Sequence, residues 1–193
     1  WVSIHNQLET LAELIQEGKI RAIGLSNEQP WGVMEFLRLS KQYGLPQIAT
    51  LQNGYNLLNR HIDFGMSEIC YRENVSLLAY SPLAFGHLSG KYLTNPQAIG
   101  RVTLFLGYAQ RYTKPNVIAA CQAYAQLAQT CGLSPTELAL SFVYHRWCVG
   151  STVIGATSMA QLQQNIAAYQ VKLTPDILKE IDAIHLRYTN PAP

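Results

Sequence analysis

Charged residues are scarce in this sequence. Asp, Glu, Lys and Arg make up 13% of its 193 residues, about half of the usual quarter. Lysine and arginine together number 14 against 12 acidic residues, so the net charge is +2, and no stripe of basic residues occurs. This balance excludes the usual electrostatically driven binder of nucleic acid. Apolar residues reach 48%, which excludes global disorder and suffices for the core of a single domain.

Long apolar runs and cysteine motifs are also missing. No apolar stretch approaches the roughly 18 residues of a membrane span, and residues 1–5 lack the charged region of a signal peptide. The chain starts at Trp1 without methionine, which indicates an internal position in a longer protein. No CxxC pair and no histidine at zinc-finger spacing occurs, so we expect no metal. We expect a cytoplasmic protein with reduced core thiols at Cys70, Cys121, Cys131 and Cys148.

Short apolar segments alternate with helical patterns along the chain. Strands are predicted at residues 20–24, 47–51, 75–79 and 149–154. Helices are predicted at residues 10–17, 30–43, 63–71, 116–130, 138–145, 158–167 and 174–186. A capping box at Ser134–Glu137 marks one of the helix starts. This alternation predicts parallel strands with helical crossovers, in either a doubly wound sheet or a (β/α) barrel.

Polar residues gather where the predicted strands end. Ser26-Asn27, Gln52-Asn53, Tyr80-Ser81 and residues 155–158 each follow one strand. In barrels and in open sheets alike, the carboxyl ends of the strands hold the ligand. Ordinary turns and caps are the plainer interpretation, but amides and an aromatic ring are not needed merely to turn a chain. The long irregular stretch 80–114 also favours a functional loop.

Common catalytic signatures fail when tested residue by residue. Residues 24–28 (GLSNE) lack the second glycine of a nucleophile elbow. Residues 86–92 (GHLSGKY) have the wrong spacing for a phosphate-binding Walker loop, and no GxGxxG follows any strand. The five histidines form no HExxH pattern. Function must therefore be sought in the strand ends.

Four segments together resemble the aldo-keto reductases. They are GKIRAIGLSN (18–27), QNGYNLL (52–58), YSPLAFG (80–86) with LSGK (88–91), and IGATS (154–158) with QL (161–162) and QN (164–165). Their order and spacing are similar to the branch that contains Tas-like reductases and potassium-channel beta subunits, and to the carboxyl-terminal half only. The resemblance implies a (β/α)8 TIM barrel of which this chain covers strands five to eight with their helices, as a half-barrel.

The resemblance also implies how the chain is organised. One domain would span 1–193, with a leading helix at 1–19 and three β/α units at 20–83. A cofactor loop would follow at 84–114, and the last helices, strand eight and the tail at 115–193.

The same resemblance implies that NADP(H) lies across the strand ends. Ser26, Asn27 and Gln52 would hold the nicotinamide carboxamide, and Tyr80 would stack on the nicotinamide ring. Lys91 and Arg101 would supply positive charge to the phosphates. With Ala156 and Thr157 neutral, a preference for NADP over NAD would rest largely on Arg101. The pyrophosphate would be surrounded by Ser81, Pro82, Leu83, Ala84, Phe85 and Gly86. The adenosine part of the cofactor would be bound by Gly155, Thr157, Gln161, Gln164 and Asn165.

The implied activity is NADP(H)-dependent reduction of aldehydes or ketones by hydride transfer. The family's proton-donating and supporting residues lie on the first four strands, so no catalytic residue is assigned to this chain. A non-catalytic NADP(H)-sensing module and an inactive truncated remnant are the alternatives. The implied partners are a small carbonyl substrate and either a missing amino-terminal half or a second copy joined through open sheet edges. Apolar residues at Trp31, Phe85 and 104–106 hint at an apolar substrate.

Overall fold

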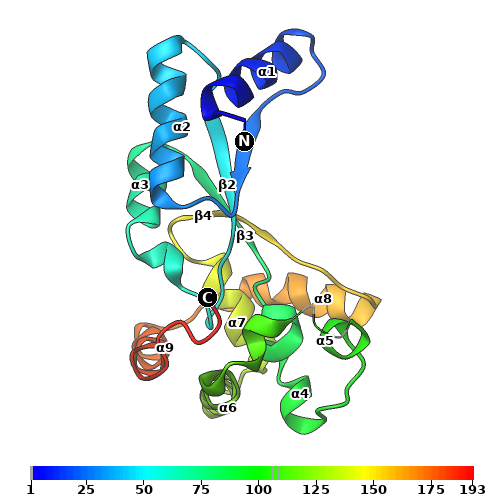
Figure 1. Ribbon diagram of the computed structural model, residues 1–193. Coiled ribbons are helices and arrows are strands. Elements are labelled where there is room, and N and C mark those ends of the chain that lie inside the picture. The colour runs from blue at the N-terminus through cyan, green and yellow to red at the C-terminus, as the bar shows by residue number, and fades with distance from the viewer. Residues whose placement is uncertain (1, 106, 108) are drawn as a thin grey trace. The chain divides into compact units, whose positions relative to one another are not determined.

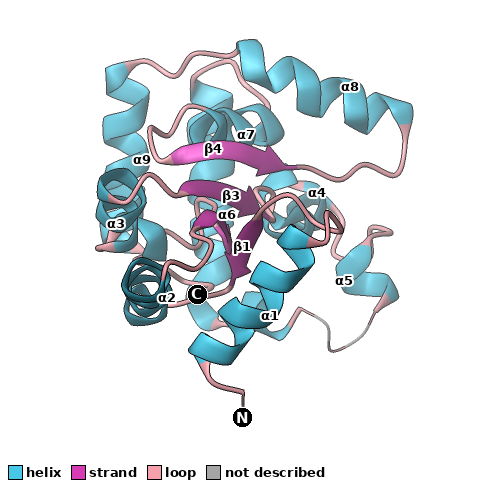
Figure 2. Cartoon of the chain, turned by 90° about the horizontal axis from the view of Figure 1, so that it is seen from above, coloured by secondary structure: helices cyan, strands magenta, loops and turns pink. Residues whose placement is uncertain are grey.

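The computed structural model of the protein describes residues 2–105, 107 and 109–193 (Figure 1). The chain forms two compact units. Unit 1 comprises residues 1–53 and 62–78, and unit 2 comprises residues 54–61 and 79–193. The single domain predicted over 1–193 stays a prediction. Figure 2 distinguishes the helices and strands of both units.

Unit 1 contains the first helices and strands. They are α1 (Ile4–Gln16), β1 (Ile23–Ser26), α2 (Pro30–Tyr43), most of β2 (Ile48–Gly54), most of the 3-10 turn η1 (His61–Asp63), α3 (Met66–Arg72) and the start of β3 (Ser76–Tyr80). The helix α1 packs on α2, and α2 packs on α3. The ends of α2 follow from its sequence, because Pro30 occupies the first turn and Gly44 closes the helix with a left-handed φ of 64°.

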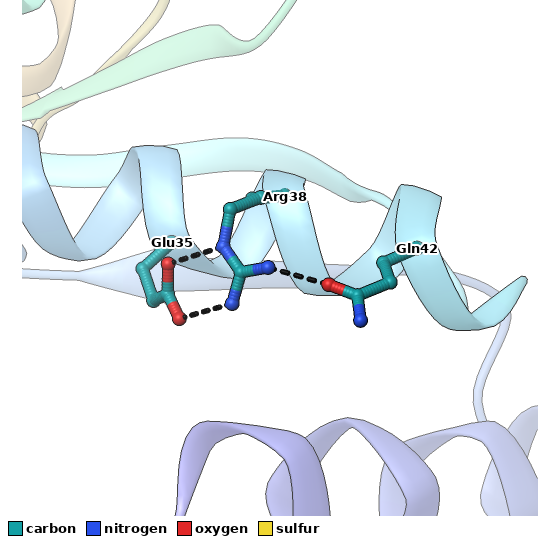
Figure 3. Close-up of polar contacts among 3 residues, drawn as sticks. All are labelled: Glu35, Arg38 and Gln42. Atoms are coloured by element: carbon teal, nitrogen blue, oxygen red, sulfur yellow. Dashed lines mark hydrogen bonds and ion pairs between the residues drawn. The ribbon is translucent and has the colours of Figure 1, made fainter.

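The exposed face of α2 carries a small polar network (Figure 3). The Arg38 Nε and Nη2 atoms donate to the two Glu35 carboxylate oxygens at 2.8 Å each, and Nη1 donates to Gln42. The hydrogen bonds from Arg38 lower the pKa of the Glu35 carboxyl group. Arg38 is exposed and Glu35 is half-buried at the helix surface, so water screens this pair and it adds little to stability.

Unit 2 contains the end of β3 and the rest of the chain. Short helical turns follow β3: η2 (Ala84–Ser89), α4 (Lys91–Thr94), α5 (Arg101–Leu104) and η3 (Gln110–Thr113). The remaining elements are α6 (Pro115–Thr130), α7 (Pro135–Tyr144), β4 (Val149–Val153), α8 (Met159–Ala167), the turn η4 (Ala168–Gln170) and α9 (Pro175–Arg187).

The four strands form one sheet in the order β1-β2-β3-β4, so β1 and β4 are its outer strands. The pairing of β1 with β2 is parallel, and its register places Ser26 opposite Gln52. This arrangement confirms the expected α/β class with a parallel sheet. The numbering of these strands as five to eight of a barrel stays a prediction.

Several predicted boundaries differ from the structure. Strand β1 starts at Ile23 and not at residue 20, because the N–H groups of Lys19 and Ile20 bond back to the Leu14 carbonyl at the end of α1. Helix α1 starts at Ile4 and not at residue 10, because the Ser3 hydroxyl accepts from the Asn6 N–H and caps it. The predicted helix 63–71 is interrupted at Gly65, whose φ is 84°.

The predicted capping box is confirmed in unit 2, where Ser134 and Glu137 cap α7 reciprocally. The helices predicted to start at residues 158 and 174 are capped by the hydroxyl groups of Ser158 and Thr174. Stretch 80–114 is irregular as predicted, although it contains short helical turns. Leu106, one of the apolar residues suggested for the substrate, lies outside the described residues. Trp1, at the start of the chain, also lies outside them. Trp31 and Phe105 are exposed.

The cysteines are all free, but they are not all core thiols as predicted. Cys70, Cys121 and Cys148 are buried, whereas Cys131 is half-buried because it caps the exposed end of α6. Burial raises the pKa of the Cys121 thiol to about 12. A buried thiol with a raised pKa carries almost no reactive thiolate near neutral pH.

We expect Cys131 to react first with a thiol reagent such as Ellman's reagent at pH 8, while the three buried cysteines react only after unfolding. The number of thiols that react rapidly should be one in the native chain and four in denaturant. The Cys131→Ser variant should lose the rapid phase and keep the slow ones. Rapid reaction of Cys121 would contradict the burial described for α6.

Candidate functional site

The carboxyl ends of β1 and β2 bring the three predicted carboxamide ligands together within unit 1. Ser26 lies opposite Gln52 in the parallel ladder. The Asn27 N–H continues the ladder by donating to the Gln52 carbonyl at 3.0 Å, and Asn27 then turns the chain with a left-handed φ of 55°. All three side chains are exposed. They can therefore offer a hydroxyl and two amides to a ligand amide.

Asn53 supports this edge although the sequence did not identify it as a ligand. Its Nδ2 atom donates to the Glu28 carbonyl at 3.0 Å and ties the end of β2 to the turn after β1. Its Oδ1 atom is buried and has no hydrogen-bond partner among the described residues. Side-chain to backbone bonds of this kind fix the position of a loop.

Tyr80 ends β3 in unit 2 and packs against a glycine. A Cβ atom on Gly54 would lie 3.3 Å from the Tyr80 ring, which is tighter than an ordinary contact. Because glycine has no Cβ atom, the ring fits at this position. The Tyr55 N–H donates to the Tyr80 carbonyl at 3.3 Å. Tyr80 is half-buried, which leaves part of the residue accessible at the end of the strand.

The segment that follows Tyr80 has an unusual backbone. Ser81, Ala84 and Phe85 have positive φ angles of 53°, 48° and 56°, and Gly86 follows with 94°. Non-glycine residues rarely adopt this region, and each costs on the order of 1–3 kcal/mol. Such residues cluster in active sites and ligand clamps. The turn is held by bonds from the Ala84 N–H to the Ser81 carbonyl at 2.9 Å and from the Gly86 N–H to the Leu83 carbonyl at 2.8 Å.

Some side chains of this turn are buried, although its backbone could still reach a ligand. Pro82 and Ala84 are buried, so their side chains belong to the core and only their backbone could reach a ligand. Ser81, Leu83, Phe85 and Gly86 are half-buried. This agrees with a segment that would wrap a pyrophosphate through main-chain groups.

Asn56 anchors the turn from the second motif. Its Nδ2 atom donates to the Ser81 carbonyl at 3.0 Å, while its Oδ1 atom accepts from the Leu58 N–H at 2.9 Å. Asn56 is 1% exposed, so both bonds are made in the interior. A side-chain hydrogen bond between Asn56 and Tyr112 adds a third connection, and burial raises the pKa of Tyr112 to about 12.

The two predicted phosphate ligands lie beside this turn. The Lys91 ammonium group donates to the Ile99 carbonyl at 3.2 Å and lies 4.8 Å from the centre of the Tyr92 ring. The Arg101 guanidinium lies 5.2 Å from the centre of the Phe85 ring. Elements α4 and α5, which carry these cations, both pack on η2. The structure therefore places two positive charges next to the left-handed turn.

The predicted adenosine residues lie in the loop after β4 and on α8. The Thr157 N–H and hydroxyl both donate to the Gln161 Oε1 atom, at 2.9 and 3.0 Å, and both residues are exposed. The exposed Gln164 donates from Nε2 to the Ser134 hydroxyl at 3.4 Å. Asn165 differs, because it is only 3% exposed and its Nδ2 atom donates to the Gly155 carbonyl at 3.2 Å. Asn165 thus fixes the end of β4 against α8.

The structure groups the predicted residues into one set in unit 1 and two in unit 2. Sequence reasoning missed the supporting residues Asn56, Tyr112 and Tyr92. Asn56 lies in the segment QNGYNLL (52–58) and could have been found as an amide close to the end of the second predicted strand. The two tyrosines gave no signal, since their role depends on how the irregular stretch folds. Among the described residues, no three His, Cys, Asp or Glu side chains gather as metal ligands, and no helix is long and apolar enough to cross a bilayer.

Comparison with known proteins shows similarity over nearly the whole chain. The model of the aldo/keto reductase family matches residues 1–186. The protein tas of Escherichia coli is 46% identical over 193 residues, which are 100% of this chain and 56% of that protein. An aldo-keto reductase of Babesia bovis is 39% identical over 198 residues, covering 98% of this chain and 70% of the relative. The L-glyceraldehyde 3-phosphate reductase of Escherichia coli is 29% identical over 163 residues, covering 82% of this chain and 47% of the relative.

The chain spans about half the length of the two Escherichia coli relatives. The family match extends over almost the whole chain, from the first helix to the end of α9. The chain belongs to the aldo/keto reductase family.

Proposed function

We propose that this chain binds NADP(H) at the carboxyl ends of its strands and carries the cofactor side of an oxidoreductase that reduces aldehydes or ketones. The left-handed turn at residues 81–86, next to Lys91 and Arg101, is the observation that carries the proposal. Strained backbone beside two cations suits a phosphate-rich ligand. Similarity to an L-glyceraldehyde 3-phosphate reductase supports an aldehyde as the substrate class.

The residues present fit the parts of a nicotinamide dinucleotide. Ser26, Asn27 and Gln52 offer the donors and acceptors that an amide group needs. Tyr80 offers a ring face at a strand end, and the cations Lys91 and Arg101 offer charge-assisted hydrogen bonds to phosphate. When bound, the cofactor supplies the hydride; these residues bind it and orient it.

The proton for the reduced carbonyl is not assigned to any residue of this chain. Burial raises the pKa values of Tyr112 and Tyr124, which makes both phenols weaker acids than free tyrosine. Tyr124 lies in α6 and is 3% exposed. Neither phenol is suited to donate a proton near neutral pH.

We also propose cytoplasmic location and self-association of the chain. The four free cysteines suit a reducing compartment. The outer strands β1 and β4 each have one neighbour in the sheet. An outer strand presents unpaired N–H and C=O groups, and β4 adds an apolar side chain, because Val153 is 45% exposed.

The Arg101→Ala variant tests the cofactor role. We expect it to weaken NADPH binding by about tenfold or more, since a hydrogen bond to a charged group contributes roughly 1.5–3 kcal/mol. NADH, which lacks the additional phosphate, should lose much less affinity. Titration of cofactor fluorescence or calorimetry measures both. The Arg111→Ala variant is the matched control, because Arg111 is an exposed arginine on η3 outside the predicted contact set. Equal losses for NADPH and NADH in Arg101→Ala would refute the assigned role.

Sedimentation at micromolar concentration tests self-association. We expect the 193-residue chain to sediment as a dimer or larger species. The Val153→Lys variant should shift it toward the monomer, because a charge on an outer strand disfavours pairing. Met159→Lys is the control, since Met159 is 68% exposed but lies on α8 outside the sheet. A monodisperse monomer of the unmodified chain would contradict the proposal.

A further inference from the structure

A group of polar side chains lies on η2, α4 and α5 in unit 2. It consists of His87, Lys91, Tyr92 and Arg101, and we refer to it as the His87 cluster. Only Lys91 and Arg101 are in the predicted cofactor set. The His87 and Tyr92 rings lie with their centres 5.1 Å apart. His87 also lies 4.9 Å from the buried ring of Tyr112, which fixes it from another side.

Two polar atoms of this cluster have no partner. The His87 Nε2 and Tyr92 Oη atoms are buried and make no hydrogen bond among the described residues. A buried polar atom without a partner destabilises the folded state, and native structures contain few of them. Two such atoms on neighbouring rings indicate that another group supplies their hydrogen bonds.

The cluster places these atoms next to positive charge. A Cβ atom on Gly100 would overlap both the Lys91 Nζ atom and the Tyr92 Oη atom, so these two atoms lie beside the same point. The φ of Gly100 is 179°, which any residue can adopt, so the glycine provides space and not backbone freedom. Arg101 follows directly in the chain. An ammonium group and a phenol thus meet beside Gly100, while the Arg101 guanidinium lies over the Phe85 ring.

The side chains of the His87 cluster are suited to bind an oxyanion. Desolvation by burial, followed by the positive charge of Lys91, lowers the pKa of His87, so its imidazole is neutral near pH 7. A neutral imidazole still carries one N–H, and a phenol carries one O–H. Phosphate oxygens accept several hydrogen bonds and favour nearby cations. Lysine and arginine have no acceptor atoms, so all four side chains can act as donors to one group.

We propose that His87 and Tyr92 donate hydrogen bonds to a phosphate group of the bound dinucleotide, beside Lys91 and Arg101. This inference rests on the proposed function and adds two binding residues to it. The phosphate group is either the 2′-phosphate of NADP(H) or the pyrophosphate that NADP(H) shares with NAD(H). Both are oxyanions, and the ligands used in the experiment separate them.

The experiment measures ligand binding and thermal stability of the 193-residue chain in parallel. The ligands are NADPH, NADH, 2′,5′-ADP and ADP, titrated by calorimetry. The variants are Tyr92→Phe and His87→Leu, with His87→Gln as a conservative variant that keeps an N–H donor. Controls are Tyr71→Phe and His61→Leu, both exposed and outside the cluster.

Tyr92→Phe and His87→Leu should each weaken NADPH binding by about tenfold, the effect of losing roughly 1.4 kcal/mol. His87→Gln should recover most of that loss, and the controls should bind as the unmodified chain does. Without ligand, Tyr92→Phe should melt at the same or a higher temperature, because it removes a buried atom that has no partner. A residue with a structural role alone would not combine weaker binding with unchanged or greater stability.

The four ligands show which phosphate is bound. If Tyr92→Phe and His87→Leu lose affinity for NADPH and 2′,5′-ADP alone, the 2′-phosphate is the bound group. If they lose affinity for NADPH, NADH and ADP, the bound group is the pyrophosphate. Unchanged NADPH affinity in Tyr92→Phe and His87→Leu would overturn the inference and leave the proposed function standing. A lower melting temperature of Tyr92→Phe without ligand would also overturn it, because the hydroxyl would then be bonded within the protein. If the unmodified chain binds none of the four ligands, the proposed function fails and the inference fails with it.

Discussion

The left-handed turn at the end of β3 is the constraint on which the candidate site depends. Three non-glycine residues, Ser81, Ala84 and Phe85, are held at positive φ. That backbone persists because the interior fixes it from both sides. Asn56 binds the Ser81 carbonyl, and the buried Tyr112 ring lies 5.4 Å from Phe85. Because the turn is strained, its surroundings must compensate for the cost, and the compensating groups come from well-buried positions.

The turn also determines where positive charge lies. Phe85 supports the Arg101 guanidinium through its ring, and a Cβ atom on Gly86 would contact the Lys91 side chain at 3.0 Å. Arg101 therefore contacts one of the strained residues, and Lys91 lies beside the glycine that follows it. This explains how a chain with only 13% charged residues can present a localised positive site. Its charges are few, but two of them are held beside one turn.

Much of the fold was predictable because its signals are local. The helix caps at Ser134, Ser158 and Thr174 follow from side-chain chemistry within one turn, and the structure confirms them. The start of β1 was predicted too early, because the N–H groups of Lys19 and Ile20 bond to α1, a choice that apolar pattern does not reveal. Cys131 was predicted as buried because pattern alone does not show that α6 ends at the surface.

The residues of the candidate site were predicted from motifs, their geometry was not, and their binding roles stay predictions. Motifs identified Tyr80, Lys91 and Arg101 through a family resemblance, and membership of that family is now shown. The roles of His87, Tyr92 and Tyr112 depend on how residues 84–113 fold back on themselves. No periodic pattern exists in that stretch from which to derive such contacts. Their contacts follow only from the folded chain, from the distances between the His87, Tyr92 and Tyr112 rings and from the buried polar atoms of His87 and Tyr92.

Nuclear Overhauser measurements on NADP⁺ in the presence of the 193-residue chain locate the nicotinamide ring. We expect cross-peaks between the nicotinamide protons and the ring protons of Tyr80, which disappear in Tyr80→Leu while the adenine protons still report binding. The absence of nicotinamide contacts to Tyr80 in a chain that binds NADP⁺ would contradict the placement of the cofactor at the end of β3.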